Sequence, residues 1–406
     1  MITRVNYRLS PSGIRVLLQA MDRLLTEGRH WLQMRIVPDG HVASHRSFTY
    51  FGKPTWGLWS AQVPKRVVQT ILDHVFAAAV QPNGDLFFRE EAEAERRLYR
   101  ALYCLLVAAA AEHPLARHPR ILSRLEQYQH ERTGAIFNYI GDDPREPRPD
   151  PFYAALLTST GVHVLLRLGW RERAMRAGEY LARMVEANRI SMEGDGIFYT
   201  QTDVNGQLIT AVPANRSWCY AVSNAKPKQE FWQIGAIMAA LAKLSGALLD
   251  DPAADQALAR RLLDAAFDLL RFEATMLPEG YEWPQKCKLA WGGGELLQTC
   301  LRHRLADDSQ LALLYRVTRR TVVNTFLDAQ LPDGSWAGDH YPLSDDAPEM
   351  DYDYRLLRGG LANAPREPTG SATCVWFTPE EMTGEFLGEM AIAAEGIRQL
   401  LSQLET

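Results

Sequence analysis

The sequence predicts an all-α protein: a closed ring of helical hairpins that carries short β-hairpins in the long loops on one rim. Three observations predict it. Apolar residues recur with the helical period along most of the chain. The candidate helices come in pairs, joined alternately by very short and very long links. A glycine-rich turn follows alternate helices, where glycine permits a positive φ angle.

The periodicity predicts eleven helices, with boundaries uncertain by a few residues. They cover residues 12–29, 64–80, 91–112, 117–130, 151–168, 171–188, 230–247, 254–276, 289–303, 308–329 and 380–402. A twelfth helix would have to lie between residues 38 and 64, where only residues 54–60 offer a candidate. Without that helix the ring would close irregularly.

Six turn signals indicate six diverged hairpins, which is the (α/α)6 toroid class, here a single domain over residues 1–406. The turns are PDGH, PNGD, TGAIF, GDGIF, PEGYEW and PDGSW, which begin at Pro38, Pro82, Thr133, Gly194, Pro278 and Pro332. Stretches rich in small residues at 154–166, 234–249 and 386–397 suit an inner ring, because Ala and Gly let helix backbones approach closely. Helices with a charged stripe belong outside.

The long links predict where a pocket should lie. Links from an outer to an inner helix are long, notably 131–150, 189–229 and 330–379, and all of them meet the same rim of such a ring. Eight of the ten tryptophans fall in or just after these links: Trp56, Trp59, Trp218, Trp232, Trp283, Trp291, Trp336 and Trp376. Each could form part of a pocket or only plug the mouth of the ring.

Composition narrows the class of protein. Apolar residues make up 47% of the chain and charged residues 23%, as in ordinary globular proteins. The formal charge of −5 has no basic block behind it, so nucleic acid is an unexpected partner. No 18-residue apolar stretch or leader is evident, and we expect a cytoplasmic protein with no membrane partner. Five cysteines without CxxC spacing suggest neither disulfides nor zinc, and the absence of a glycine-rich phosphate loop argues against a nucleotide cofactor.

Two segments resemble sugar enzymes of the toroid class. The stretch Phe231-Trp232-Gln233-Ile234-Gly235-Ala236 and the hairpin DGIFYTQTDVNGQL from Asp195 are similar to the N-acylglucosamine 2-epimerases and the unsaturated uronyl hydrolases. In those families an aromatic residue and a Gln or Arg open an inner helix. This resemblance implies an isomerase, lyase or glycoside hydrolase with no cofactor and places Trp232 and Gln233 at the substrate.

Two other toroid families share short patterns with this chain. FLDAQLPDGSW from Phe326 resembles the Gln-to-Trp repeat of squalene-type cyclases and protein prenyltransferases, and Asp351 to Tyr354 loosely resembles the Asp-rich acid motif of the cyclases. Trp218-Cys219-Tyr220 resembles the lanthionine-forming cyclases, although the Cys-His zinc ligand pair of those enzymes is missing. These resemblances imply the same ring with a different chemistry.

Candidate catalytic residues are acids and a histidine in the long links. His340 could titrate near neutrality, Glu282 beside Trp283 could be a carboxylic acid with a raised pKa, and Asp339 and Asp353 are further acids. The alternative for His340 is a solvated loop histidine, and for Glu282 it is a surface glutamate that follows a turn. Candidate substrate-binding residues are the cations and aromatic residues of the same rim: Arg216, Trp218, Trp232, Gln233, Trp283, Lys286, Trp291, Trp336, Tyr341 and Trp376.

The first hypothesis is therefore an enzyme that isomerises, eliminates from or hydrolyses a small carbohydrate or similar, possibly anionic, substrate by acid/base catalysis. The alternative is an isoprenoid or polyketide cyclase or isomerase that uses a single acid. A lanthionine-cyclase-like enzyme and a non-catalytic binding scaffold stay open, as does a homo-oligomer. A pocket wall of paired charges would favour a sugar, and a mostly aromatic and aliphatic wall would favour an isoprenoid.

Overall fold

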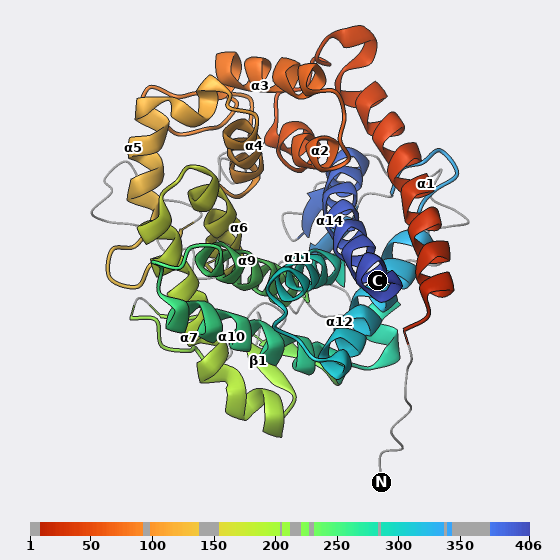
Figure 1. Cartoon of the computed structure of the whole chain (residues 1–406). Coiled ribbons are helices and arrows are strands. Elements are labelled where there is room, and N and C mark those ends of the chain that lie inside the picture. The colour runs from red at the N-terminus through yellow and green to blue at the C-terminus, as the bar shows by residue number, and fades with distance from the viewer. Residues whose placement is uncertain are drawn as a thin grey trace.

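The chain forms a closed double ring of helices in a computed structural model (Figure 1). The structure describes residues 9–91, 98–137, 154–203, 205–211, 221–226, 231–282, 286–336, 339–342 and 374–406. Six inner helices each pack against the next, and the last of them packs against the first. These are α2 (Phe48–Ser60), α4 (Leu98–Ala110), α6 (Ala154–Arg167), α9 (Trp232–Leu249), α11 (Lys288–His303) and α14 (Pro379–Glu405).

Six outer helices surround this inner ring, so the predicted (α/α)6 toroid is confirmed. Residues 322–327 continue the last of them as a π-helix, and the described parts of the links contain the short 3-10 helices η1 (Pro38–Gly40), η3 (Pro114–Arg117) and η5 (Pro278–Glu282). The outer helices are α1 (Pro11–Ile36), α3 (Lys65–Ala79), α5 (Pro119–Tyr128), α7 (Arg171–Gly194), α10 (Gln256–Ala274) and α12 (Asp308–Thr321).

Helix α2 is the twelfth helix that the sequence left open. It contains Gly52, Pro54 and Gly57, which lower intrinsic helix propensity. A Cβ atom at Gly52 would lie 2.5 Å from the carbonyl oxygen of Arg100 on α4, and one at Gly57 would overlap the carbonyl oxygen of Gly384 on α14. The glycines therefore allow α2 to pack against two neighbouring backbones, and this packing replaces the missing local propensity.

Antiparallel strand pairs lie in two of the long links, but among the described residues the hairpin expected from Asp195 to Leu208 forms only its first strand and an isolated bridge between Thr202 and Leu208. Strands β1 (Ile197–Tyr199) and β2 (Ala221–Ser223) pair antiparallel between α7 and α9. Strands β3 (Asp339–Pro342) and β4 (Cys374–Phe377) pair antiparallel before α14. Both links run from an outer helix to the N-terminal end of an inner helix.

The segment FLDAQLPDGSW connects two neighbouring outer helices through hydrogen bonds from Gln330. We call this contact a glutamine tie. The side-chain amide of Gln330 donates to the carbonyl oxygens of Gly334 (2.9 Å) and of Leu24 on α1 (3.1 Å). Gly334 has a φ of 90°, and a Cβ atom there would lie 2.9 Å from the backbone of Glu27. The turn thus packs directly against the next outer helix.

The same tie recurs after α5. The side-chain amide of Gln129 donates to the carbonyl oxygens of Gly134 (3.1 Å) and of Arg173 on α7 (2.9 Å). Gly134 also has a positive φ, 83°. The glutamine contact is therefore repeated in this ring, although the turn after α5 ends in Phe137 and not in a tryptophan.

Helix α9 corrects the expectation that no apolar stretch is long enough to cross a membrane. Its 18 residues satisfy that criterion by length and composition. It is an inner helix, however, and 83% of it is buried. Contact with α6, α10 and α11 on several sides accounts for its apolar composition.

Candidate functional site

A cluster of six ionisable side chains lies near the N-terminal ends of four inner helices. Each residue is at most 9% exposed. We call this group the axial charge cluster, and its members are Lys53 on α2, Arg100 on α4, Lys288 on α11 and Glu381, Glu385 and Glu389 on α14. Buried charges are costly unless they are paired, so their concentration here is informative.

Ion pairs neutralise one half of the cluster. The Arg100 guanidinium donates two hydrogen bonds to the Glu381 carboxylate, from Nε to Oε1 at 2.9 Å and from Nη2 to Oε2 at 3.1 Å. Lys53 Nζ lies 3.4 Å from Glu381 Oε1 and also donates to Glu385. Burial lowers the pKa of Lys53, and the Glu381 carboxylate partly offsets the shift. This half holds fixed, paired charges.

Glu389 is the acid that differs from its neighbours. Lys288 contacts Glu385 directly, whereas its Nζ lies 3.5 Å from Glu389 Oε1. Neither carboxylate oxygen of Glu389 has a hydrogen-bond partner of ordinary geometry. Complete burial raises the pKa of Glu389, and the Lys288 cation and the Cys287 thiol only partly offset the rise. Glu389 is thus disposed to carry a proton at a pH where an exposed glutamate would not.

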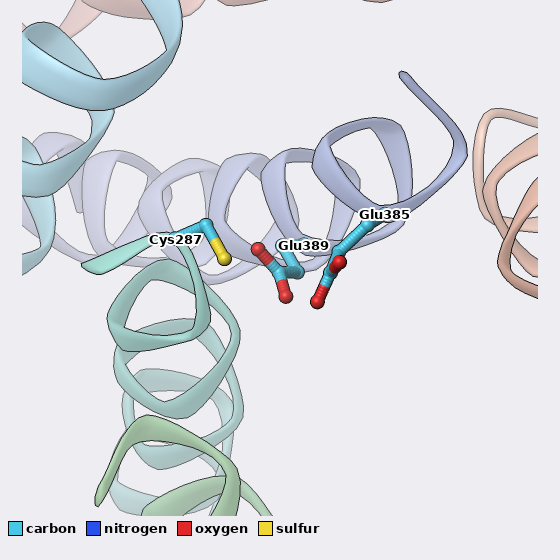
Figure 2. A group of neighbouring side chains, drawn as sticks. All are labelled: Cys287, Glu385 and Glu389. Carbon is cyan, nitrogen blue, oxygen red and sulfur yellow. The ribbon is translucent and has the colours of Figure 1, made fainter. Parts of the chain in front are cut away.

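Cys287, Glu385 and Glu389 also form the one group of possible metal ligands among the residues that the structure describes (Figure 2). One donor atom from each lies within 4.8 Å of the others. A thiolate and two carboxylates could hold a divalent cation such as zinc. Here Lys288 already pairs with both carboxylates, and burial together with Glu389 keeps the pKa of the Cys287 thiol well above its usual range. The lysine supplies the positive charge that this group needs.

An aromatic layer lies one helical turn further along the inner helices. The ring centroids of Trp56 and Tyr103 are 5.1 Å apart, those of Trp56 and Trp291 are 5.2 Å apart, and those of His163 and Trp291 are 4.7 Å apart. A Cβ atom at Gly388 would overlap the Trp56 ring, so this indole lies against the α14 backbone. The layer separates the axial charge cluster from the space beyond it.

That space is a cavity of about 920 Å³. It is lined by the C-terminal halves of the inner helices, and its wall includes Trp56, Trp291 and two ion pairs. One pair joins Lys243 Nζ to Glu295 Oε2 at 3.1 Å, and the other joins Arg398 to Asp22. The cavity lies at the end of the ring with the short links, opposite the rim where the link lengths predicted the pocket.

Three of the expected substrate-binding residues lie near the start of α9 and α11 and are buried. Trp232 is 5% exposed, and Gln233 and Lys286 are fully buried. Lys286 pairs with Glu273 on α10, and its Nζ lies 3.4 Å from the ring centroid of Phe231. Burial lowers the pKa of Lys286 to about 8. Its charge is therefore already matched inside the protein.

Two of the tryptophans that were expected to bind substrate, Trp291 and Trp336, lie in different surroundings. Trp291 lines the cavity. Trp336 is fully buried; its indole N–H donates to the Phe326 carbonyl oxygen at 3.1 Å, and its ring packs edge-on against Phe386. Because it also touches Gly28 of α1, Trp336 packs between an outer and an inner helix and does not line the cavity.

The remaining candidates lie in the long links. Asp339, His340 and Tyr341 form part of β3, and His340 pairs in register with Trp376 on β4. Glu282 ends η5. The other four lie outside the described residues: Arg216, Trp218, Trp283 and Asp353.

The axial charge cluster escaped the sequence analysis although one signal for it was present. Glu381, Glu385 and Glu389 recur every four residues, which puts them on one face of α14. Like charges at this spacing destabilise an isolated helix. Three of them in a helix otherwise rich in small residues indicate cationic partners on neighbouring helices.

Comparison with known proteins identifies the fold class. No family model and no curated protein sequence matches the chain. Among solved structures, the ring is similar to type II terpene cyclases. One match is a variant of the cyclase MstE from Scytonema in complex with geranylgeranyl dihydroxybenzoate, with 13% identity, a TM-score of 0.52 and coverage of 94% of this chain and 99% of that one. A second, ligand-free variant gives 12% identity, a TM-score of 0.51 and the same coverage.

These two neighbours favour the alternative reading of the sequence over the first one. They share the toroid fold over nearly the whole length of both chains. Neither is a sugar epimerase or a uronyl hydrolase, so the first resemblance gains no support from them. At 12–13% identity the likeness establishes the fold alone.

Proposed function

We propose that this protein is an enzyme that cyclises a small isoprenoid-bearing molecule by protonating it with a buried carboxylic acid, Glu389. The observation that carries the proposal is a fully buried carboxyl group whose pKa is raised by burial and whose oxygens lack ordinary hydrogen-bond partners. It occurs in a ring that is similar in fold to type II terpene cyclases over 94% of the chain.

The proposed reaction balances without a leaving group. The Glu389 carboxyl group transfers its proton to one carbon of an alkene, and the π electrons of that alkene form the new C–H bond. The cationic carbon that remains is attacked by the next alkene, and ring closure continues until a proton is lost to a base. One proton is gained and one is lost, so the product is an isomer of the substrate.

Other residues of the inner ring would support this chemistry. Trp56, Tyr103 and Trp291 present aromatic rings next to the cluster, and a cation over such a ring is stabilised by about 0.5–2 kcal/mol. The Glu385 carboxylate pairs with both Lys53 and Lys288. The two carboxyl groups therefore have different surroundings, since Glu385 contacts two lysines and Glu389 has a pKa raised by burial.

Isotope incorporation tests the reaction type. The purified protein is incubated in D₂O with prenylated hydroxybenzoates, free polyprenols and polyprenyl diphosphates, and the products are analysed by mass spectrometry. We expect an isomeric product that carries one deuterium. Release of diphosphate, or a cyclic product without deuterium, would show that ionisation and not protonation starts the reaction.

The Glu389→Gln variant tests the proposed acid. It keeps the shape of the side chain and removes the proton that is transferred, so turnover should fall by about 10²- to 10⁴-fold. Glu395→Gln, on the same helix at the cavity wall, is the matched control and should retain activity. Equal activity of both variants and the wild-type protein would remove Glu389 from the mechanism.

The cavity wall favours a second candidate function. The ion pairs Lys243–Glu295 and Arg398–Asp22 are the paired charges that a polar substrate such as a sugar would require. On this hypothesis the acid/base residue lies at the cavity, and Glu295 is the buried carboxylate of its wall. His340 and Glu282 lie in the long links at the opposite end of the ring and do not line this cavity. A panel of amino sugars and uronates, assayed with wild-type protein and with Glu295→Gln, separates the two functions, since only a sugar enzyme would turn over the panel and lose that activity in the variant.

A further inference from the structure

The cavity at the short-link end of the ring has the construction of a ligand site. Its floor is made by Trp56, His163 and Trp291, which are 3%, 5% and 1% exposed. Leu25, Leu106 and other aliphatic side chains form part of its wall. A volume of about 920 Å³ lies within the range of small-molecule pockets.

Two buried polar atoms at this floor have no partner. The indole N–H of Trp291 and Nε2 of His163 make no hydrogen bond within the part of the chain that is described. An unpaired buried polar group destabilises the folded protein. Both rings line the cavity, but these two atoms are themselves buried, so the rings offer a ligand their apolar surfaces and not these nitrogens.

The charged residues around the cavity favour an anion. Five cationic side chains line it against three acidic ones. Lys243 and Arg398 are paired with acids. The other three cations are Arg29, Lys65 and Arg167, and no carboxylate lies within ion-pair distance of them among the described residues. Arg29 is half-buried, and its one hydrogen bond to a described residue goes from Nη1 to the Ala61 carbonyl oxygen at 3.3 Å, so its other N–H groups can donate to a ligand.

We propose that this cavity binds an amphiphilic organic anion, an apolar chain or ring that carries one carboxylate or phosphate group. The apolar part would lie on the Trp56 and Trp291 floor, and the anionic group would be bound by Arg29. The aromatic layer stands between this site and Glu389, so the ligand is distinct from the substrate of the proposed cyclisation and does not take part in it.

Binding of a homologous series tests the ligand chemistry. Decanoate, decyl phosphate, decanol and decyltrimethylammonium are titrated into the full-length protein, with tryptophan fluorescence and calorimetry as readouts. We expect one molecule of decanoate or decyl phosphate to bind at least tenfold more tightly than decanol, and the cation not to bind. The ratio of decanoate to decyl phosphate affinity identifies the preferred headgroup. Equal affinity for the anions and decanol would overturn the proposal.

Variants place the ligand in the cavity. Arg29→Gln should weaken decanoate binding about tenfold and leave decanol binding unchanged, whereas Arg23→Gln, an exposed arginine on the same helix, should change neither. Ala110→Trp, at the cavity wall, should block both ligands, and circular dichroism checks that it folds. Unchanged decanoate affinity in Arg29→Gln and in folded Ala110→Trp would exclude this site.

The two proposals fail separately. Glu389→Gln should bind decanoate with wild-type affinity while it loses cyclase turnover. Loss of decanoate binding in that variant would contradict the separation of the sites. If the wild-type protein has no cyclase activity, the proposed function is wrong. The affinities for decanoate and its analogues still decide whether the cavity binds an anion.

Discussion

His163 couples the floor of the cavity to protein stability. Burial lowers its pKa well below the usual value, and Lys243 and Arg167 add to the shift. The unfolded chain therefore binds a proton on this histidine below about pH 6.5 that the folded protein does not bind. Because the unfolded state takes up more protons, this histidine lowers the free energy of unfolding as the pH falls below 6.5, by up to about 1.4 kcal/mol per pH unit.

The His163→Phe variant tests this contribution. Between pH 6.5 and pH 5.5 the variant should lose about 1 kcal/mol less unfolding free energy than the wild-type protein, measured by urea denaturation. His30→Phe, at an exposed position on α1, controls for the loss of an imidazole ring elsewhere. Parallel pH profiles for wild-type protein and His163→Phe would show that His163 is protonated in the folded state.

The surroundings of single residues were harder to predict from the sequence than the helices were. Lys286 was expected to bind substrate because it belongs to the cations of the long links; that role is untested, and the fold buries this lysine against Glu273 of α10. Glu389 was overlooked because its raised pKa depends on burial by α11 and on Lys288 and Cys287. Both properties come from residues that meet only after the ring has closed. The four-residue spacing of the three glutamates indicates cationic partners, but it does not show which of the three has a raised pKa.

At the scale of elements, the glutamine ties account for how adjacent outer helices are held together. Gln330 satisfies one carbonyl group of its own turn and one of α1, 306 residues earlier in the sequence. Removing its amide leaves both carbonyl groups without this donor. The Gln330→Ala variant should therefore lose about 1–3 kcal/mol of unfolding free energy.

The measurement is urea denaturation of Gln330→Ala beside Gln399→Ala. Gln399 lies on α14, and its one described hydrogen bond is an exposed one to Glu395, so its loss should change the stability by less than about 0.5 kcal/mol. Similar stabilities of the two variants would mean that the repeated tie is a consequence of the packing and not one of its causes.

Helices were predictable where periodicity and local propensity agree. All eleven expected helices exist, and the expected inner positions of α6, α9 and α14 are confirmed. Helix α2 was uncertain because its glycines and proline oppose helix formation locally and favour it only through contact with α4 and α14. The expected helix 308–329 ends as a π-helix, a change of hydrogen-bond register that apolar spacing does not reveal.

At the scale of the whole molecule, closure of the ring depends on α14. This helix packs against α11 on one side and α2 on the other, so segments from opposite ends of the chain meet there (Figure 1). It also carries all three glutamates of the axial charge cluster. Without α14, the cations Lys53, Arg100 and Lys288 would lose every carboxylate partner in that cluster.

Deletion of residues 379–406 should therefore abolish cooperative folding and not merely lower stability. Breaking even one buried ion pair by removing one partner costs about 3–5 kcal/mol, and a whole domain has only about 5–15 kcal/mol of stability. The deletion removes several such partners together with one sixth of the inner ring.

Urea denaturation followed by circular dichroism compares this deletion with removal of residues 402–406. The shorter deletion removes exposed residues and the Arg15–Glu405 pair, whose side chains are 56% and 41% exposed. Such a pair contributes about 0–1 kcal/mol, so the shorter protein should unfold cooperatively near the wild-type midpoint. If the protein that lacks residues 379–406 also unfolds cooperatively, the other helices form a stable open ring without α14. The ion pairs of the axial charge cluster would then not be needed for folding.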